Sequence, residues 1–356
     1  MAPSLPGSAL VASAQRFIGE GDLTAAEMAC KDALRLDPAN AMAMNLLGGI
    51  AAQAQALETA VEWLFAAVAV DPLFDSAHAN LRIVLVTAGR PGDAIVHFEA
   101  LTKAHPSYLA GFLNLARLHF AAPNWQAAQA VLTTAVSLEP DSAEAQYLLG
   151  EVYRITEQSE PAIATLEIAV RLDPKNAVAL NNLGLLYNAK GNTRAAEKYY
   201  RLAVVVDPTS KEISSNLASS LAKLGDTAGA KSQYELTLAI DPNYAKARSD
   251  YAAVLRSRGD VDAARQQFLS AIELEPNYAD AQTNLAVVEL SLGLLEQGAK
   301  RYEWRRQVST WRSLAPASGI PELTGQPVAG KTLLVYAEQG MGDCVQFVRY
   351  VSELHA

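Results

Sequence analysis

Eight prolines are spaced along this chain at constant intervals of 34 residues. All but one of them follow an acidic residue. Because proline disfavours the α conformation in the residue before it, each Asp-Pro or Glu-Pro step marks the end of a helix. A period of this length, kept without slippage, indicates a stack of similar small folding units. The prolines are Pro38, Pro72, Pro106, Pro140, Pro174, Pro208, Pro242 and Pro276, and His105 precedes the exception.

Small residues recur at two fixed places in each period. With Gly7 as position 1, position 20 is Ala or Gly in all nine units, from Ala26 to Gly298. Position 8 is small in eight of the nine, which lets the two helices of one hairpin approach closely. Arg82 is the exception, and its side chain either splays the third hairpin or extends out along its aliphatic stem. The small residues at position 8 are Ala14, Gly48, Ala116, Gly150, Gly184, Ala218, Ala252 and Ala286.

A turn separates the two helices of each unit. Several turns end in a residue suited to cap the second helix, namely Asp22, Asn192, Asp226 and Asp260. Large aromatic residues at position 24, such as Tyr200, are expected to fill the groove between hairpins. Glycine occupies the turn in six units, at Gly21, Gly89, Gly191, Gly225, Gly259 and Gly293.

Together these features resemble the tetratricopeptide repeat (TPR) family over residues 7–308. The resemblance implies an all-α fold, a right-handed superhelical solenoid of about nine helix-turn-helix repeats. The ninth repeat is degenerate, since Thr310 stands where the proline would be. The resemblance also implies a scaffold that binds other proteins or peptides.

In such a solenoid, positions 2, 5, 6, 9, 12 and 13 of the first helices would form a continuous inner wall. Position 6 is a carboxamide in five units and an aspartate in a sixth. Carboxamides both donate and accept hydrogen bonds, so a row of them can hold an extended peptide backbone. The TPR domain of nucleocytoplasmic O-linked N-acetylglucosamine transferases is similar here. Alternatively, Asn tolerates a solvated face or bonds to the neighbouring helix. The predicted peptide-binding residues are Asn80, Asn114, Asn182, Asn216, Asp250 and Asn284.

Composition narrows the function further. A formal net charge of −9 argues against a general nucleic-acid binder. We find no signal peptide at the N-terminus and no apolar run of about 18 residues, so we expect a cytoplasmic chain without a membrane span. The five histidines follow no metal-ligand spacing, and we expect neither a metal nor another cofactor. Cys30 and Cys344 imply no disulfide framework.

Beyond the repeats the pattern changes. Residues 1–6 are expected to form a tail and residues 309–330 a linker rich in Pro and Gly. Residues 325–332 satisfy the phosphate-loop pattern GxxxxGK[ST], but no strand precedes them, so we do not predict nucleotide hydrolysis. Residues 331–356 contain a strand candidate, a Gly-containing turn and an amphipathic helix, which is the opening of a Rossmann-like unit.

Residues 338–343 (Glu-Gln-Gly-Met-Gly-Asp) and the flanking segments resemble bacterial TPR proteins that end in a heptosyltransferase-like glycosyltransferase. The resemblance implies that Asp343 is a general base for an acceptor hydroxyl and that Gly340 and Gly342 form the acceptor loop. The alternative is that Asp343 caps the helix after it. Because only about 25 residues of such a domain are present, we interpret the chain as the repeat region of a larger enzyme. A nucleotide-sugar is expected to bind only where the full catalytic domain is present.

Overall fold

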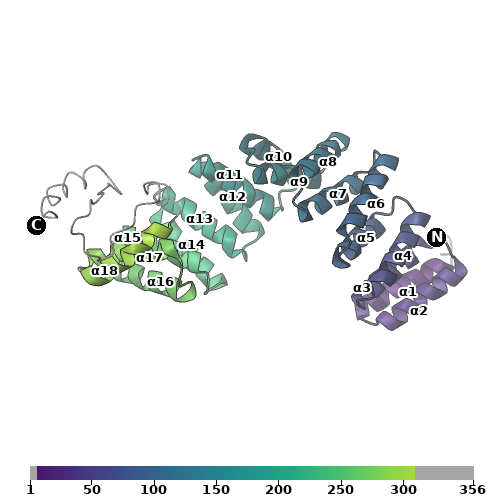
Figure 1. Cartoon of the computed structure of the whole chain (residues 1–356), viewed down its shortest axis with the longest axis horizontal. Coiled ribbons are helices and arrows are strands. Elements are labelled where there is room, and N and C mark those ends of the chain that lie inside the picture. The colour runs from purple at the N-terminus through teal and green to yellow at the C-terminus, as the bar shows by residue number, and fades with distance from the viewer. Residues whose placement is uncertain (1–5, 309–356) are drawn as a thin grey trace, which may run out of the picture. The chain divides into compact units, whose positions relative to one another are not determined.

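The computed structural model of this chain describes residues 6–308. These residues form eighteen α-helices and one terminal 3-10 helix, and they contain no strand. Consecutive helices pair into antiparallel hairpins (Figure 1). In chain order the elements are α1 (Pro6–Glu20), α2 (Leu23–Leu36), α3 (Ala41–Gln53), α4 (Leu57–Val70), α5 (Asp75–Thr87), α6 (Pro91–Ala104), α7 (Leu109–Ala121), α8 (Trp125–Leu138), α9 (Ala143–Ile155), α10 (Ser159–Leu172), α11 (Ala177–Ala189), α12 (Thr193–Val206), α13 (Lys211–Lys223), α14 (Thr227–Ile240), α15 (Ala245–Ser257), α16 (Val261–Leu274), α17 (Ala279–Ser291), α18 (Leu295–Tyr302) and η1 (Glu303–Gln307).

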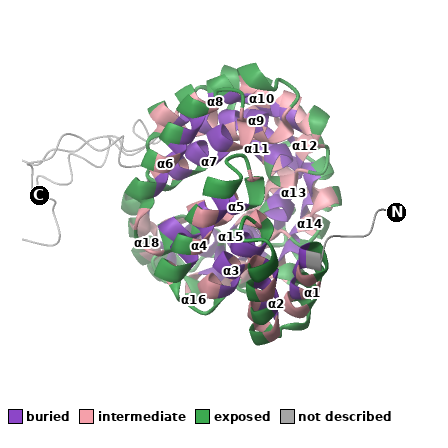
Figure 2. Ribbon diagram, turned by 90° about the vertical axis from the view of Figure 1, so that its right-hand side faces the viewer, coloured by how far each residue is buried: buried purple, intermediate pink, exposed green. Residues whose placement is uncertain are grey.

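The described residues divide into two compact units, residues 6–207 and residues 208–308. The first contains the hairpins from α1–α2 to α11–α12, and the second contains those from α13–α14 to α17–α18. Within each unit a helix contacts its hairpin partner and the helices of the next hairpin. Buried residues therefore lie on the faces that helices turn toward one another, while the loops are exposed (Figure 2). No helix in the described part of the chain is long and apolar enough to cross a membrane.

The acidic residue before each proline ends a helix, as predicted. Asp37, for example, has an extended backbone with φ −139° and ψ 93° directly after α2. Its carboxylate also accepts a hydrogen bond from the N–H of Ala39 at 3.1 Å. Asp71, Asp173 and Asp241 each make the same bond two residues onward. The acid is therefore part of the turn itself, because its side chain closes the loop in which the proline lies.

The turn between the two helices of a hairpin contains a residue whose backbone is in the left-handed conformation in the eight hairpins with a positive φ. All six predicted glycines have φ between 72° and 85° there, a region that L side chains rarely adopt. Two hairpins place non-glycine residues in the same conformation, Gln55 at φ 61° and Glu157 at φ 60°. The capping prediction is confirmed for Asp22, Asn192 and Asp226, each of which accepts an N–H from the first turn of the next helix. It is wrong for Asp260, whose side chain makes no cap hydrogen bond.

Small residues at position 8 admit the large side chain at position 24 of the same hairpin. A Cβ added to Gly184 would lie 2.4 Å from the ring of Tyr200, and one added to Gly48 would lie 2.6 Å from Leu64. Tyr200 is fully buried. The predicted close approach of the two helices is confirmed. The ring at this position also reaches the groove between hairpins, as the sequence had indicated, since Tyr234 stacks on Tyr251 of the next hairpin with ring centroids 6.0 Å apart.

The third hairpin departs from this rule because of Arg82. Its helices α5 and α6 pack against each other less extensively than the two helices of any other hairpin. The Arg82 side chain extends to α7, where its Nε donates to Oδ1 of Asn114 at 2.9 Å. Both alternatives left open by the sequence therefore hold, since the hairpin is splayed and the side chain extends along its stem.

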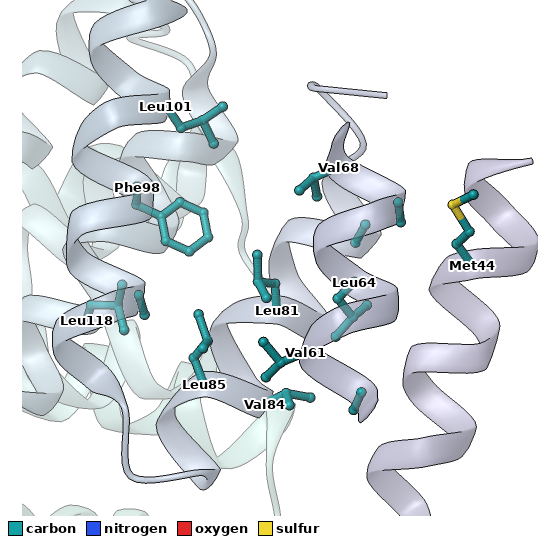
Figure 3. Packing of buried hydrophobic residues seen from close by; sticks show 14 of the residues in the cluster. Met44, Val61, Leu64, Val68, Leu81, Val84, Leu85, Phe98, Leu101 and Leu118 are labelled. Atoms are coloured by element: carbon teal, nitrogen blue, oxygen red, sulfur yellow. The ribbon is translucent and has the colours of Figure 1, made fainter. Parts of the chain in front are cut away.

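Apolar packing fills the space around this opened hairpin. One cluster runs through the second, third and fourth hairpins (Figure 3). Leu81 and Leu85 of α5 lie between Leu64 of α4 on one side and Phe98 of α6 with Leu118 of α7 on the other. The third hairpin is thus held by both of its neighbours rather than by its own two helices alone.

The expected linker at residues 309–330 and the expected glycosyltransferase-like segment at residues 331–356 lie outside the described residues. Asp343, Gly340 and Gly342 lie there too.

Candidate functional site

We call the side chains at positions 2, 5, 6, 9, 12 and 13 of the first helices the first-helix wall, and we describe it separately in each unit. In the first unit, adjacent first helices contact one another at several steps, including α3 with α5 and α9 with α11. Of these four helices, α5 and α11 carry an asparagine of the predicted row, whereas α3 and α9 carry Leu46 and Leu148 at the same position. The wall is therefore a shared surface of neighbouring hairpins.

Three of the predicted asparagines bond across these steps. The Nδ2 of Asn80 donates to Oδ1 of Asn45 at 2.9 Å. The Nδ2 of Asn182 donates to Oε2 of Glu151 at 2.5 Å. Asn114 accepts from Arg82, as described above. A carboxamide has two donors and two acceptor sites, so each of these bonds uses a part of its capacity.

Burial differs along the row. Asn114 and Asn182 are buried, whereas Asn80, Asn216 and Asn284 are half-buried. Asn80, Asn114 and Asn182 join neighbouring first helices, which is the alternative that the sequence had left open for them. Asn80, Asn216 and Asn284 are partly exposed to solvent.

Exposed aliphatic residues follow three of the asparagines by one helical turn. Ile83 is 50% exposed, Leu185 is 37% exposed and Val287 is 41% exposed. Each lies three residues after an asparagine of the row and therefore on the same helix face. The sequence analysis missed this pairing, although it could have been found, because position 9 of these three repeats is aliphatic while position 6 is asparagine.

Charges on the first-unit wall are paired. The Nη2 of Arg117 lies 2.5 Å from Oε1 of Glu144, and Arg154 forms an ion pair with Glu151. Burial, followed by the nearby charge of Arg117, lowers the pKa of Arg82. This part of the wall presents both signs of charge side by side.

In the second unit the wall contains an open pocket of about 310 Å³ between α13 and α15, with α14 beneath it. Asp250, the one acid among the predicted residues, lines it and bonds through Oδ2 to Nζ of Lys246 at 2.9 Å. The lining residues are Ser219, Ala222, Lys223, Thr227, Tyr234, Asp250, Ala253, Val254 and Ser257.

Two histidines meet inside the third hairpin. The Nε2 of His97 lies 3.2 Å from Nδ1 of His78, whose own Nε2 lies 2.9 Å from the carbonyl oxygen of Pro72. Burial lowers the pKa of His97 to about 4. The rings pack beside Phe98. No group of three or more His, Cys, Asp or Glu side chains in the described residues is placed to hold a metal ion.

Antiparallel helix pairs that recur every 34 residues and pack on their neighbours define a helical-hairpin repeat protein. Profiles of the tetratricopeptide repeat match residues 11–73, 85–152, 143–176, 165–198 and 252–293. The chain belongs to the tetratricopeptide repeat family. No curated protein matches it.

Several solved structures are similar to this chain. A chain of the APC/C hetero-tetramer Cut9–Hcn1 matches with a TM-score of 0.51 and 15% identity, over 82% of this chain and 57% of that one. YrrB, a TPR protein with an unusual peptide-binding site, matches at 0.48 and 23% identity, over 52% and 95%. PilF of Pseudomonas aeruginosa matches at 0.49 and 19% identity, over 57% and 92%. At these identities the likeness concerns the fold alone.

Proposed function

We propose that this chain is a scaffold that binds an extended peptide segment of a partner protein along the first-helix wall. The observation that supports the proposal is the pairing of a carboxamide with an exposed aliphatic side chain one turn later, in α5, α11 and α17. An extended peptide presents backbone amides and alternating side chains along its length. The carboxamides suit the backbone, and the aliphatic residues suit the apolar side chains.

Within this proposal the asparagines have two roles. Asn216 and Asn284 are half-buried and are the members that we expect to meet the peptide. Asn80, Asn114 and Asn182 act mainly by holding adjacent first helices in register, through Asn45, Arg82 and Glu151. We therefore expect substitution of Asn284 to weaken peptide binding directly, and substitution of Asn182 to weaken it through the shape of the wall.

Fluorescence polarisation with a library of short labelled peptides tests the proposal on the purified chain. Leu185→Ser should weaken binding about fivefold, because the peptide loses about 1 kcal/mol of apolar contact. Leu202→Ser is the matched control, since Leu202 is 45% exposed on the second helix α12 and lies off the wall. Equal loss in both variants, or no binding of any library member, would contradict the proposal.

Glycosyl transfer by a larger protein that includes these repeats is a second candidate, and it rests on sequence alone. Its support is the run from Glu338 to Asp343, with Asp343 as base and Gly340 and Gly342 as acceptor loop. The genomic reading frame tests it. Codons for a second Rossmann half downstream of Ala356 would support this candidate, and an in-frame stop there would remove it.

A further inference from the structure

We propose that the pocket between α13 and α15 is a subsite for one basic side chain, Lys or Arg, of the bound peptide. The inference rests on the proposed function, because it specifies which type of side chain one residue of the bound peptide carries. It concerns the second unit alone, in which all of the lining residues lie.

The pocket exists because three wall positions carry small side chains. Ser219 and Ala222 are positions 9 and 12 of α13, and Ala253 is position 9 of α15. At the equivalent step between α9 and α11 the same positions carry the longer side chains of Glu151, Arg154 and Leu185. Small side chains therefore open the wall at the step between α13 and α15, above the buried ring of Tyr234.

Asp250 gives the pocket its preference for a cation. It stands where five other repeats carry asparagine, so the row gains a negative charge at the place where the wall is hollowed. Lys246 engages its Oδ2 alone. The side chains of this ion pair are 52% and 34% exposed, so solvent weakens the pair and an incoming cation can compete for the carboxylate.

The rest of the lining suits the stem of a basic residue. Ala222, Ala253 and Val254 are apolar and can pack along the methylene groups of Lys or Arg. The hydroxyls of Ser219 and Ser257 can accept the remaining N–H donors of an ammonium or guanidinium group.

The pocket also has a cation in its lining, Lys223. It is the last residue of α13, whereas Asp250 lies in the first half of α15, so the two charges belong to different ends of the pocket. We expect a basic side chain to bind at the Asp250 end. An acidic side chain would instead favour the end with Lys223, and the experiment below separates the two outcomes.

The test uses short peptides that have one chosen central residue and only Gly, Ala and Ser at the other positions. Their affinities for the full chain are measured at low and at high salt. We expect central Lys or Arg to bind about tenfold more tightly than the neutral analogues norleucine or citrulline. The preference should shrink at high salt, since the pair is partly exposed. Asp250→Asn, which restores the residue of the other repeats, should abolish the preference while neutral peptides still bind.

Two further variants complete the design. Ala253→Leu fills the pocket and should weaken binding of the basic peptides with unchanged helicity by circular dichroism. Asp262→Asn removes an exposed acid from the second helix α16 and should leave the preference intact. Peptide binding without a preference for Lys or Arg, or with a preference for Glu, would overturn the subsite and leave the proposed function standing. Absence of binding by these peptides would overturn the subsite, and absence of binding by every member of the labelled library would overturn the proposed function as well.

Discussion

The Nε of Arg301 donates a hydrogen bond to Oε2 of Glu289 at 3.1 Å, and the Glu289 side chain is only 1% exposed. Arg301 also donates through Nη1 to Oε1 of Gln282 at 2.5 Å. Arg265 of α16 contributes a second, longer contact to the same carboxylate at 3.9 Å. A buried charge thus joins α16, α17 and α18 at the end of the second unit.

Replacing Arg301 should loosen the last hairpin. Arg301→Met leaves the Glu289 carboxylate buried with the distant Arg265 as its remaining cation, and we expect a loss of about 3 kcal/mol. Hydrogen exchange of the amides in α17 and α18 measures this locally, which a repeat array requires. Lys300→Met is the control because Lys300 is exposed. Equal exchange in the two variants would contradict the assignment.

The non-glycine turns offer a gain in stability. Glu157 has φ 60°, in a position where six other hairpins use glycine. Because a left-handed conformation costs an L residue about 1–2 kcal/mol, Glu157→Gly should stabilise the fifth hairpin by about 1 kcal/mol. Thermal denaturation and local hydrogen exchange measure the change. Gly191→Glu is the reverse experiment and should destabilise the sixth hairpin. A stability loss in Glu157→Gly would contradict the prediction.

A single methyl group should disturb the sixth hairpin. Gly184→Ala brings a Cβ within 2.4 Å of the buried ring of Tyr200, which has no open space to move into. We expect a loss of about 1–3 kcal/mol, the usual range for overpacking. Gly49→Ala is the control, since nothing lies within 4 Å of a Cβ there. Chemical denaturation followed by hydrogen exchange compares them, and equal effects would argue against the close contact.

The third hairpin should lose stability as the pH falls. Burial, and next the charge of His78, holds the pKa of His97 at about 4, below its unfolded value of 6.5. Between these values the unfolded chain binds more protons, so the free energy of unfolding decreases as pH drops from about 6.5 toward 4. A proton NMR titration of the imidazoles tests the pKa directly. His97→Phe should reduce the pH dependence of hydrogen exchange in α5 and α6, and an unchanged dependence would count against the pair.

Much of the fold could be predicted from the sequence because its determinants are local. Proline spacing places the ends of the second helices, and Asp22 or Asn192 caps the helix that begins beside it. The exceptions depend on neighbours. Asp260 has the right residue type for a cap, yet it makes no such bond. The path of Arg82 depends on Asn114, 32 residues further on, which no single repeat contains.

The candidate site was less predictable from the sequence, because it depends on contacts between neighbouring helices and hairpins. A pattern identifies a row of asparagines, but whether Asn182 faces a ligand or Glu151 depends on how two hairpins pack. The pocket arises from the combined sizes of Ser219, Ala222 and Ala253 on two helices. The histidine contact likewise joins two helices of one hairpin, so the spacing of the histidines gave no sign of it. Residue types suggest chemistry, and packing decides which atoms remain available for it.

In four loops the acid before the proline bonds within the loop itself, which has a consequence for how the number of repeats can change. Since Asp37 or Asp173 bonds within two residues of itself, the junction between hairpins is completed by residues inside one period. Ser142 and Asn176 cap the first helices of successive hairpins in the same way. Duplication or loss of one whole period therefore rejoins equivalent ends. A gene for such a chain can therefore gain or lose whole repeats, each with its share of the first-helix wall. The loops between the remaining hairpins keep their hydrogen bonds.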